Sequence, residues 1–340
     1  MINKFNIYFK YYLISLFFFS IIYLTTKHNV SNDSTISEWL LNYSGGFTKR
    51  GLIGQSSIIL ANLFNSNLRD VILFFQISLV GIYYILLFLF FRNIPTNKVI
   101  ILSIFTPIFI LYPIAEIEVL ARKEVFIFCI FITYLFVNNN TIKIIYKLTV
   151  LPIGMLIWEP FIFLIPFFVA LDIIENNFEK INTKFLKYLT LYAPAIILAF
   201  YIALNPLTLE NHESMANYLK TNFNENCYTA CALLASKSSI YDQFEANFRD
   251  YSFSVFFRYF LIILIGFGPL ILLAKNSVLQ NKNLFFFKYF QNLLIPMSIL
   301  LLPTIFLFAM GSDWGRWVNI SYVFGIILYI YLYQKKINYD

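Results

Sequence analysis

The sequence predicts an all-α, polytopic integral membrane protein with about ten helical segments, because long apolar runs recur throughout it. Hydrophobic residues make up 59% of the 340 residues and charged residues only 13%. A helix of roughly 20 apolar residues crosses the hydrocarbon core of a bilayer. The polar stretches between the runs contain no linker, so we expect one transmembrane domain, residues 1–340.

The first span is expected at about Tyr8 to Thr26. Its apolar run from Tyr11 to Leu24 follows Lys4 and Lys10 as the core of a secretory signal would. No small-residue cleavage site follows it, so we expect an uncleaved first span. In the polar stretch 27–70, apolar and polar residues alternate at helical spacing from Leu52 to Asn65. This pattern predicts an amphipathic helix in the membrane interface.

Two further spans are expected at about Val71 to Phe91 and Val99 to Ala115. A fourth span ends near Val137, and Lys143 and Lys147 mark a basic turn after it.

The next apolar stretch, about Leu148 to Ile174, is interrupted by Trp158-Glu159-Pro160. One continuous helix would bury a carboxylate in the membrane and lose a backbone hydrogen bond at the proline. We therefore expect two short helices that meet at Glu159, either as a re-entrant hairpin or as two tilted spans.

The remaining spans are expected at about Tyr188 to Ala203, Phe253 to Leu273, Asn292 to Met310 and Val318 to Tyr333. Lysines and arginines are scattered in short segments between spans, so the net charge of +7 indicates orientation in the membrane rather than a nucleic-acid partner. The positive-inside rule predicts that both termini are cytoplasmic, and we expect the protein in the plasma membrane. The rule makes 27–70 and 204–252 extracytoplasmic loops.

This topology places four polar segments on the extracytoplasmic side: 42–54, 116–124, 158–160 and 313–317. Together they form a candidate site. The candidate catalytic carboxylates are Asp33, Glu38, Glu159 and Asp313. The candidate substrate-binding residues are Gly45, Gly46, Lys49, Arg50, Arg122, Lys123, Trp158, Arg316 and Trp317.

These residue types suit a sugar carried on a polyprenyl phosphate or diphosphate. Arginine and lysine would hold the phosphate, and a helix beginning after Lys49 and Arg50 would add free backbone amides. Tryptophan faces suit sugar rings, and a carboxylate would take the proton of the acceptor hydroxyl. Membrane lipid, a polyprenyl-linked sugar and a saccharide acceptor are therefore the expected partners.

Each of these features also has a purely structural interpretation. The tryptophans are typical of an interfacial belt, and Gly45 and Gly46 of a tight turn. Arg122 and Lys123 could pair with Glu118 or Glu124 in a solvated turn, and Asp313 with Arg316 in a local salt bridge at the start of the last span.

The sequence leaves cofactor use open. A divalent metal would need a ligand cluster, and His212 stands alone in the polar loop that holds Cys227 and Cys231. These two cysteines could form a disulfide if the loop is extracytoplasmic, whereas Cys129 lies in an apolar run and is expected to be a packing residue.

The stretches Gly-Gly-Phe-Thr-Lys-Arg-Gly, residues 45–51, and Asp-Trp-Gly-Arg-Trp, residues 313–317, occur in an architecture that resembles bacterial enzymes of surface-polysaccharide assembly. It is similar both to GT-C-type glycosyltransferases and to O-antigen or exopolysaccharide polymerases. The first resemblance implies Glu38 or Asp33 as the catalytic base, although GT-C enzymes often carry a paired acidic motif there. The second instead implies roles for the loop arginines Arg50, Arg122 and Arg316.

The expected function is glycosyl transfer from a polyprenyl-linked sugar at the extracytoplasmic face. A flippase or other transporter is an alternative that requires a polar path through the spans, whereas almost every charge is expected in a loop. A non-catalytic subunit of a membrane complex is a third.

Overall fold

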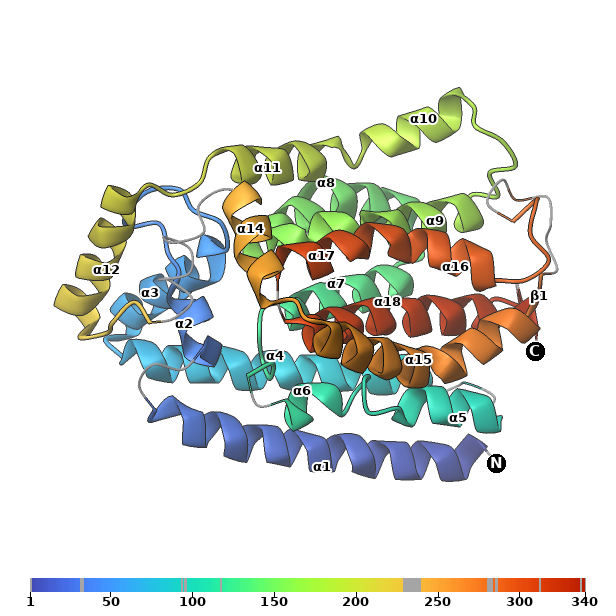
Figure 1. The fold of residues 1–340 in the computed structure, drawn as a ribbon, viewed down its shortest axis with the longest axis horizontal. Helices are drawn as coiled ribbons and strands as arrows, with labels where there is room; N and C mark the ends of the chain where they lie inside the picture. The colour runs from blue at the N-terminus through green and yellow to red at the C-terminus, as the bar shows by residue number, and fades with distance from the viewer. Residues whose placement is uncertain are drawn as a thin grey trace.

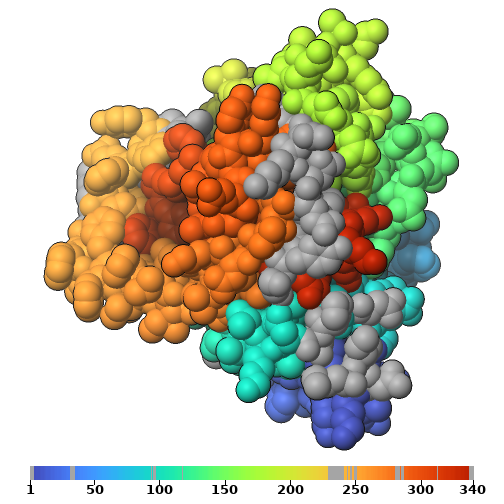
Figure 2. All heavy atoms as spheres, turned by 90° about the vertical axis from the view of Figure 1, so that its right-hand side faces the viewer, coloured from blue at the N-terminus to red at the C-terminus, as the bar shows by residue number. Residues whose placement is uncertain are grey.

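The computed structural model is almost entirely helical, and its helices lie along one long axis (Figure 1). It describes residues 2–30, 34–92, 94, 97–116, 118–228, 240–279, 284, 287–311, 313–336 and 338–339. Both termini lie at one end of this axis, and helices α2, α3 and α12 lie at the other (Figure 1). Seen from the end with the termini, α1 and α10 form opposite edges of the molecule (Figure 2).

The first half of the chain contains α1 Ile2–His28, α2 Ser34–Leu40, α3 Gly51–Phe64, α4 Leu68–Phe91, α5 Lys98–Phe105, α6 Tyr112–Ala115, α7 Glu124–Phe136 and α8 Asn140–Ile157. The second half contains η1 Glu159–Leu164, α9 Ile165–Glu175, α10 Thr183–Thr190, α11 Ala193–Leu204, α12 Leu209–Phe223, α14 Ile240–Asp250, α15 Phe253–Asn276, α16 Leu294–Leu301, η2 Leu302–Thr304, α17 Ile305–Met310 and α18 Trp314–Gln334. The short strands β1 Val278–Leu279 and β2 Asn338–Tyr339 pair antiparallel.

Among the described residues, five helices are long and apolar enough to cross a membrane. They are Lys4–His28 of α1, α4, α8, α15 and α18. The pair α10 and α11, bent by 45°, passes the same test if it is counted as one span. The all-helical class and the long apolar helices agree with the fold expected from the sequence.

Helix α18 forms the centre of the molecule. In the most apolar 18-residue stretch of α18, 89% of the residues are buried, against 11% in the corresponding stretch of α15. It packs against α7, α15, α16 and α17. Because its first turn lies at the end away from the termini, α18 places Arg316 and Trp317 there.

Two spans expected to be continuous are broken at prolines. The third expected span consists of α5 and α6 around a turn at Pro107, where the preceding Thr106 is extended, as residues before proline usually are. The carbonyls of Ile108 and Phe109 in this turn accept hydrogen bonds of 2.8 and 3.0 Å from Asn319 of α18. The pass expected from 292 to 310 is likewise interrupted, at Pro303 in η2.

The helix predicted from Leu52 to Asn65 is confirmed as α3. Its buried face carries small residues, and a Cβ on Gly54 would lie 2.0 Å from the carbonyl oxygen of Leu41. Its large apolar residues Leu63 and Phe64 are exposed. The polar stretch 204–252 also contains helices, α12 and α14.

The break at Trp158 is confirmed, but the predicted basic turn at Lys143 and Lys147 is wrong. Helix α8 already begins at Asn140, so both lysines lie inside it and are buried. Lys147 pairs with Asp172, and Lys143 pairs with Glu175. These pairs join the start of α8 to the end of α9, so residues 140–175 form an antiparallel helical pair.

Asp172 anchors this helical pair through both of its carboxylate oxygens. It accepts hydrogen bonds from the hydroxyls of Tyr134 and Tyr192, at 2.8 and 2.7 Å, besides pairing with Lys147. The expectation that almost every charge lies in a loop is therefore wrong for this group. Paired in this way, the buried lysine avoids the cost of an isolated charge.

We predict that Asp172→Ala lowers the free energy of unfolding by about 3–5 kcal/mol, because Lys147 is left buried without a counter-ion. Thermal unfolding of the protein in detergent would measure this. Glu179→Ala, at an exposed position soon after α9, is the control and should change little. Equal midpoints for the two variants would contradict a stabilising role for the pair.

Candidate functional site

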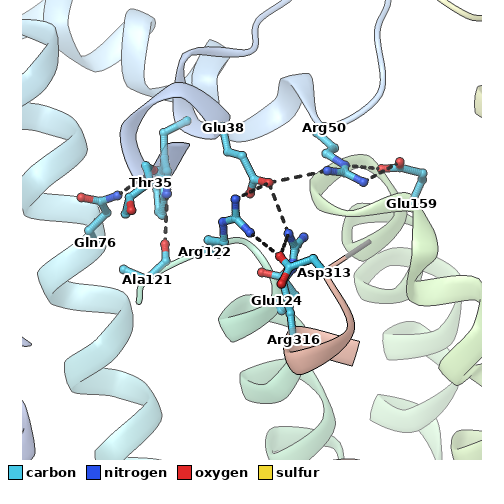
Figure 3. Close-up of polar contacts among 11 residues, drawn as sticks. Thr35, Glu38, Arg50, Gln76, Ala121, Arg122, Glu124, Glu159, Asp313 and Arg316 are labelled. Atoms are coloured by element: carbon cyan, nitrogen blue, oxygen red, sulfur yellow. Dashed lines mark hydrogen bonds and ion pairs between the residues drawn. The ribbon is translucent and has the colours of Figure 1, made fainter. Parts of the chain in front are cut away.

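The structure brings together the four polar segments at the end away from the termini (Figure 3). Five cations, Lys49, Arg50, Arg122, Lys123 and Arg316, meet four carboxylates, Glu38, Glu124, Glu159 and Asp313. We call these nine residues the ion cluster. Its five positive and four negative formal charges leave one positive charge uncompensated.

Helix α2 positions Glu38 and is itself held from two sides. Gln76 of α4 donates a hydrogen bond to the carbonyl of Thr35, at 3.3 Å. The indole of Trp39 is fully buried and donates to the carbonyl of Ala121, at 3.0 Å. Ala121 has a φ of 56°, so this contact stabilises the left-handed turn that precedes Arg122 and Lys123.

Arg50 precedes the first residue of α3 and has a left-handed backbone, with a φ of 62°. Its side chain forms a two-pronged ion pair with Glu159, with N–O distances of 2.8 and 3.0 Å. Its carbonyl accepts a hydrogen bond from the ammonium of Lys123. The break in the helix at Trp158 thus gives Glu159 a partner outside the apolar core.

Glu38 lies at the centre of the ion cluster, with only 4% of its surface exposed. Its Oε1 atom lies 3.7 Å from Arg50 Nη1 and 3.8 Å from both Arg122 Nη2 and Arg316 Nη1. Its Oε2 atom is buried and has no hydrogen-bond partner among the described residues. One carboxylate therefore neutralises arginines from three separate segments and keeps an acceptor atom free.

Arg316 joins the centre of the fold to the ion cluster. It pairs with the buried carboxylate of Glu124 on α7 and, at 3.4 Å, with Asp313. Asp313 also pairs with Arg122 at 3.1 Å, and 41% of its side chain is exposed. The local pair of Asp313 and Arg316 expected from the sequence is thus present, and Asp313 additionally connects the ion cluster to solvent.

Burial and neighbouring charges shift the pKa values of Glu38 and Lys123 in the ion cluster. Burial alone would raise the pKa of Glu38, but the fields of Arg122, Arg316, Arg50 and Lys123 outweigh it and hold that pKa at about 2. Burial lowers the pKa of Lys123 to about 7, with nearby Glu38 opposing this shift. Glu38 is thus fully ionised at neutral pH, whereas Lys123 exchanges its proton close to it.

An apolar groove of about 360 Å³ adjoins the ion cluster. It lies between η1, α11, α14 and α17, and Thr48, Lys49 and Glu159 provide polar atoms in its wall. Burial lowers the pKa of Lys49, and Glu159 opposes this shift. Within the described part of the chain Lys49 forms no ion pair, and the buried hydroxyl of Thr48 has no hydrogen-bond partner. The groove therefore offers a free cation and a free hydroxyl beside an apolar wall.

Several expected ligand contacts are not available in this arrangement. Trp158 and Trp317 are buried, with their rings 6.3 Å apart, so their faces neither meet solvent nor form an interfacial belt. Gly45 faces α12, where an added Cβ would lie 1.9 Å from the carbonyl oxygen of Asn211. Gly46 has a φ of 114°, which favours glycine in this turn. Close packing accounts for Gly45, and turn geometry for Gly46.

Arg122 and Lys123 were expected, as one alternative, in a solvated turn. Both are buried, and Arg122 forms ion pairs with Asp313 and Glu38. No role was expected for Thr48, and Glu124 was expected as an ion-pair partner of Arg122 or Lys123 in a solvated turn. A charge at the first residue of the apolar helix α7 is the signal that could have identified Glu124.

Two residues with an expected role are not described by the structure. These are Asp33 and Cys231, which lie outside the described residues. Cys227 forms a disulfide, and Cys129 is a free thiol. Among the residues that are described, no group of three or more His, Cys, Asp and Glu side chains could hold a metal ion.

We predict that Glu38→Gln destabilises the protein at neutral pH by about 3–5 kcal/mol, because three arginines lose a shared buried counter-ion. In the wild type, the pKa of Glu38 falls from an ordinary 4.5 to about 2 on folding. The unfolded chain therefore binds more protons between these pH values, and stability declines as the pH falls through this window.

Thermal midpoints of detergent-solubilised protein, measured from neutral pH down to about pH 2, would test this. The acid-dependent decline should be smaller in Glu38→Gln than in the wild type. Glu210→Gln on the exposed side of α12 serves as the control and should titrate as the wild type does. An unchanged decline in Glu38→Gln would show that Glu38 is not the counter-ion.

Comparisons of the chain with models of protein families, with curated proteins and with solved structures found no match. The chemistry of the ion cluster and its groove must therefore indicate what the protein does.

Proposed function

We propose that the protein transfers a glycosyl group from a polyprenyl-phosphate- or diphosphate-linked sugar to a saccharide acceptor at the extracytoplasmic face of the plasma membrane. Such a donor has an apolar tail and an anionic head, and both must be held where membrane and water meet. The supporting observation is the apolar groove that reaches the ion cluster at Lys49 and Glu159.

The donor phosphate would bind at Lys49. This lysine forms no ion pair with the described residues, so an incoming phosphate need not displace a carboxylate from it. Helix α3 begins two residues later, and its first backbone amides favour an anion. The unpartnered hydroxyl of Thr48 supplies a further donor. The tail would lie along the side chains of α11 and α17 that line the groove.

The reaction forms a bond between the anomeric carbon and the acceptor oxygen and breaks the bond to the phosphate oxygen. The polyprenyl phosphate leaves with that electron pair, and the acceptor hydroxyl loses a proton. Glu38 is a poor acceptor for this proton, because a group with a pKa of about 2 is far from the operating pH. Asp313, which reaches solvent and the ion cluster, is the better candidate base.

The resemblance to GT-C enzymes implied Glu38 or Asp33 as the base. The geometry favours a different task for Glu38, which is to hold Arg50, Arg122 and Arg316 in one place. Negative charge that develops on the leaving phosphate would be stabilised by these preorganised cations.

The same proposal includes ten passes through the membrane. These are α1, α4, α5 with α6, α7, α8, η1 with α9, α10 with α11, α15, α16 with α17, and α18. Basic residues such as Lys98, Lys187 and Lys335 lie at or near the end with both termini, which we assign to the cytoplasm. The exposed apolar residues of α3 would then lie in the membrane interface on the extracytoplasmic side.

We expect Lys49→Met to weaken binding of a polyprenyl phosphate by roughly tenfold or more, because the phosphate loses a charge-assisted contact. The matching polyprenol has no phosphate, so its binding should not change. Binding to protein in nanodiscs would be followed with fluorescent forms of both lipids. Lys220→Met, on the exposed side of α12, is the control.

Asp313→Asn should bind the lipid normally and transfer sugar about a hundredfold more slowly, as expected for loss of a general base. Transfer would be measured with a panel of polyprenyl-phosphate sugars in proteoliposomes. Wild-type protein that prefers the polyprenol, or that binds neither lipid, would overturn the proposal. Lipid binding without transfer would instead favour a transporter or a non-catalytic subunit.

The topology can be tested separately by labelling single cysteines in intact cells. Glu213→Cys on α12 should react with a membrane-impermeant maleimide added from outside. Lys187→Cys on α10 should react only after the cells are permeabilised. The reverse pattern would place the ion cluster on the cytoplasmic side.

A further inference from the structure

A second cavity lies beside the ion cluster, and the donor lipid does not account for it. It has a volume of about 380 Å³ and lies between α6, α15 and α18. Polar and apolar atoms contribute almost equally to its wall, in contrast to the apolar groove. The residues that define its chemistry are Tyr112, Glu116, Arg258, Tyr259, Asp313 and Gly315.

Arg258 supplies the positive charge of this cavity. It lies on α15, close to the start of a helix that is mostly exposed, and its guanidinium stacks on the ring of Tyr259 at 5.1 Å. Within the described residues it forms no ion pair. An exposed arginine without a counter-ion can bind an external anion without first breaking an internal salt bridge.

The negative charges of the cavity come from Glu116 and Asp313. A ligand that carries one acidic group is therefore oriented, because its acidic group is attracted to Arg258 and repelled by the two carboxylates. Its hydroxyls, by contrast, can donate hydrogen bonds to Glu116 and Asp313. The rings of Tyr112 and Tyr259 provide apolar surface between these groups.

A close contact between two elements limits the size of the cavity. A Cβ on Gly315 would lie 2.3 Å from the hydroxyl oxygen of Tyr112, so glycine at residue 315 leaves room for this tyrosine side chain. A larger side chain there must displace Tyr112 or fill the cavity. Gly315 therefore offers a way to alter this cavity without touching Arg258 or Asp313.

We propose that this cavity binds the acceptor, and that the acceptor is an acidic saccharide. Its carboxylate or phosphate pairs with Arg258, and its reacting hydroxyl lies at Asp313. This assignment rests on the proposed glycosyl transfer. It places the two substrates at opposite ends of one series of ion pairs. This series links the acceptor cavity to the donor groove and runs through Asp313, Arg122, Glu38, Arg50 and Glu159.

The test uses the full-length protein in nanodiscs of phosphatidylcholine, with glucuronate and glucose as matched acidic and neutral probes. Trp314 packs on Tyr259, with ring centroids 5.2 Å apart, so tryptophan fluorescence reports on the cavity wall. We expect glucuronate to bind at least about tenfold more tightly than glucose, since it adds a charge-assisted contact. Arg258→Gln should abolish this preference and leave glucose binding unchanged.

Two further variants locate the effect. Gly315→Val should weaken binding of both sugars. Lys288→Gln should change neither, although Lys288 resembles Arg258 in being exposed and in lying over the tyrosine that follows it. Equal binding of the two sugars by the wild type, or a preference that survives Arg258→Gln, would overturn the proposal.

A further experiment with an anionic lipid tests whether the anion bound by Arg258 belongs to a saccharide or to a phospholipid head group. Nanodiscs that contain phosphatidylglycerol should leave the glucuronate preference intact. If Arg258→Gln changes only retention of phosphatidylglycerol, seen by native mass spectrometry, then Arg258 anchors lipid and the acceptor assignment is wrong. The donor-lipid experiment reports on the proposed transfer independently, so the two proposals can fail separately.

Discussion

The end of the molecule away from the termini depends on the ion pairs that the carboxylate of Glu38 forms with three arginines. Arg50, Arg122 and Arg316 come from segments far apart in the chain, and all approach one oxygen of that carboxylate within 3.8 Å. Without it, three guanidinium groups that lie close together would lose a shared counter-ion. With it, the start of α3, the turn before α7 and the start of α18 are held in one arrangement.

Burial of charge is costly, and proteins commonly concentrate it where it serves function. Two groups of buried charges among the described residues differ in this respect. The group around Asp172 and Lys147 has no acceptor atom left for a ligand, because both carboxylate oxygens of Asp172 already have partners and both residues are buried. The ion cluster instead keeps an unpartnered oxygen at Glu38 and borders two cavities through Lys49, Glu159 and Asp313. The unpartnered hydroxyl of Thr48 lies in the wall of one of these cavities. This difference supports a ligand site at the ion cluster and a structural role for the other group.

Polar side chains also determine how the helices are interrupted. Pro107 interrupts the helix expected from Val99 to Ala115, and the carbonyls of Ile108 and Phe109 accept hydrogen bonds from Asn319 of the central helix. Periodicity alone predicts a continuous span in this region, because the partner lies more than two hundred residues away. The error at Lys143 and Lys147 has the same origin, since their partners are carboxylates on the following helix.

The sequence by itself determined the helical class with its long apolar helices, helix α3, the interruption at Glu159 and the same-side grouping of four polar segments. Apolar run length and charge distribution act locally, so they can be read without coordinates. Only the tertiary structure decided that Glu38 pairs with three arginines, that Trp158 and Trp317 are buried, and that Arg258 and Asp313 share a cavity. Those features depend on distances between helices, which no local pattern in the chain encodes.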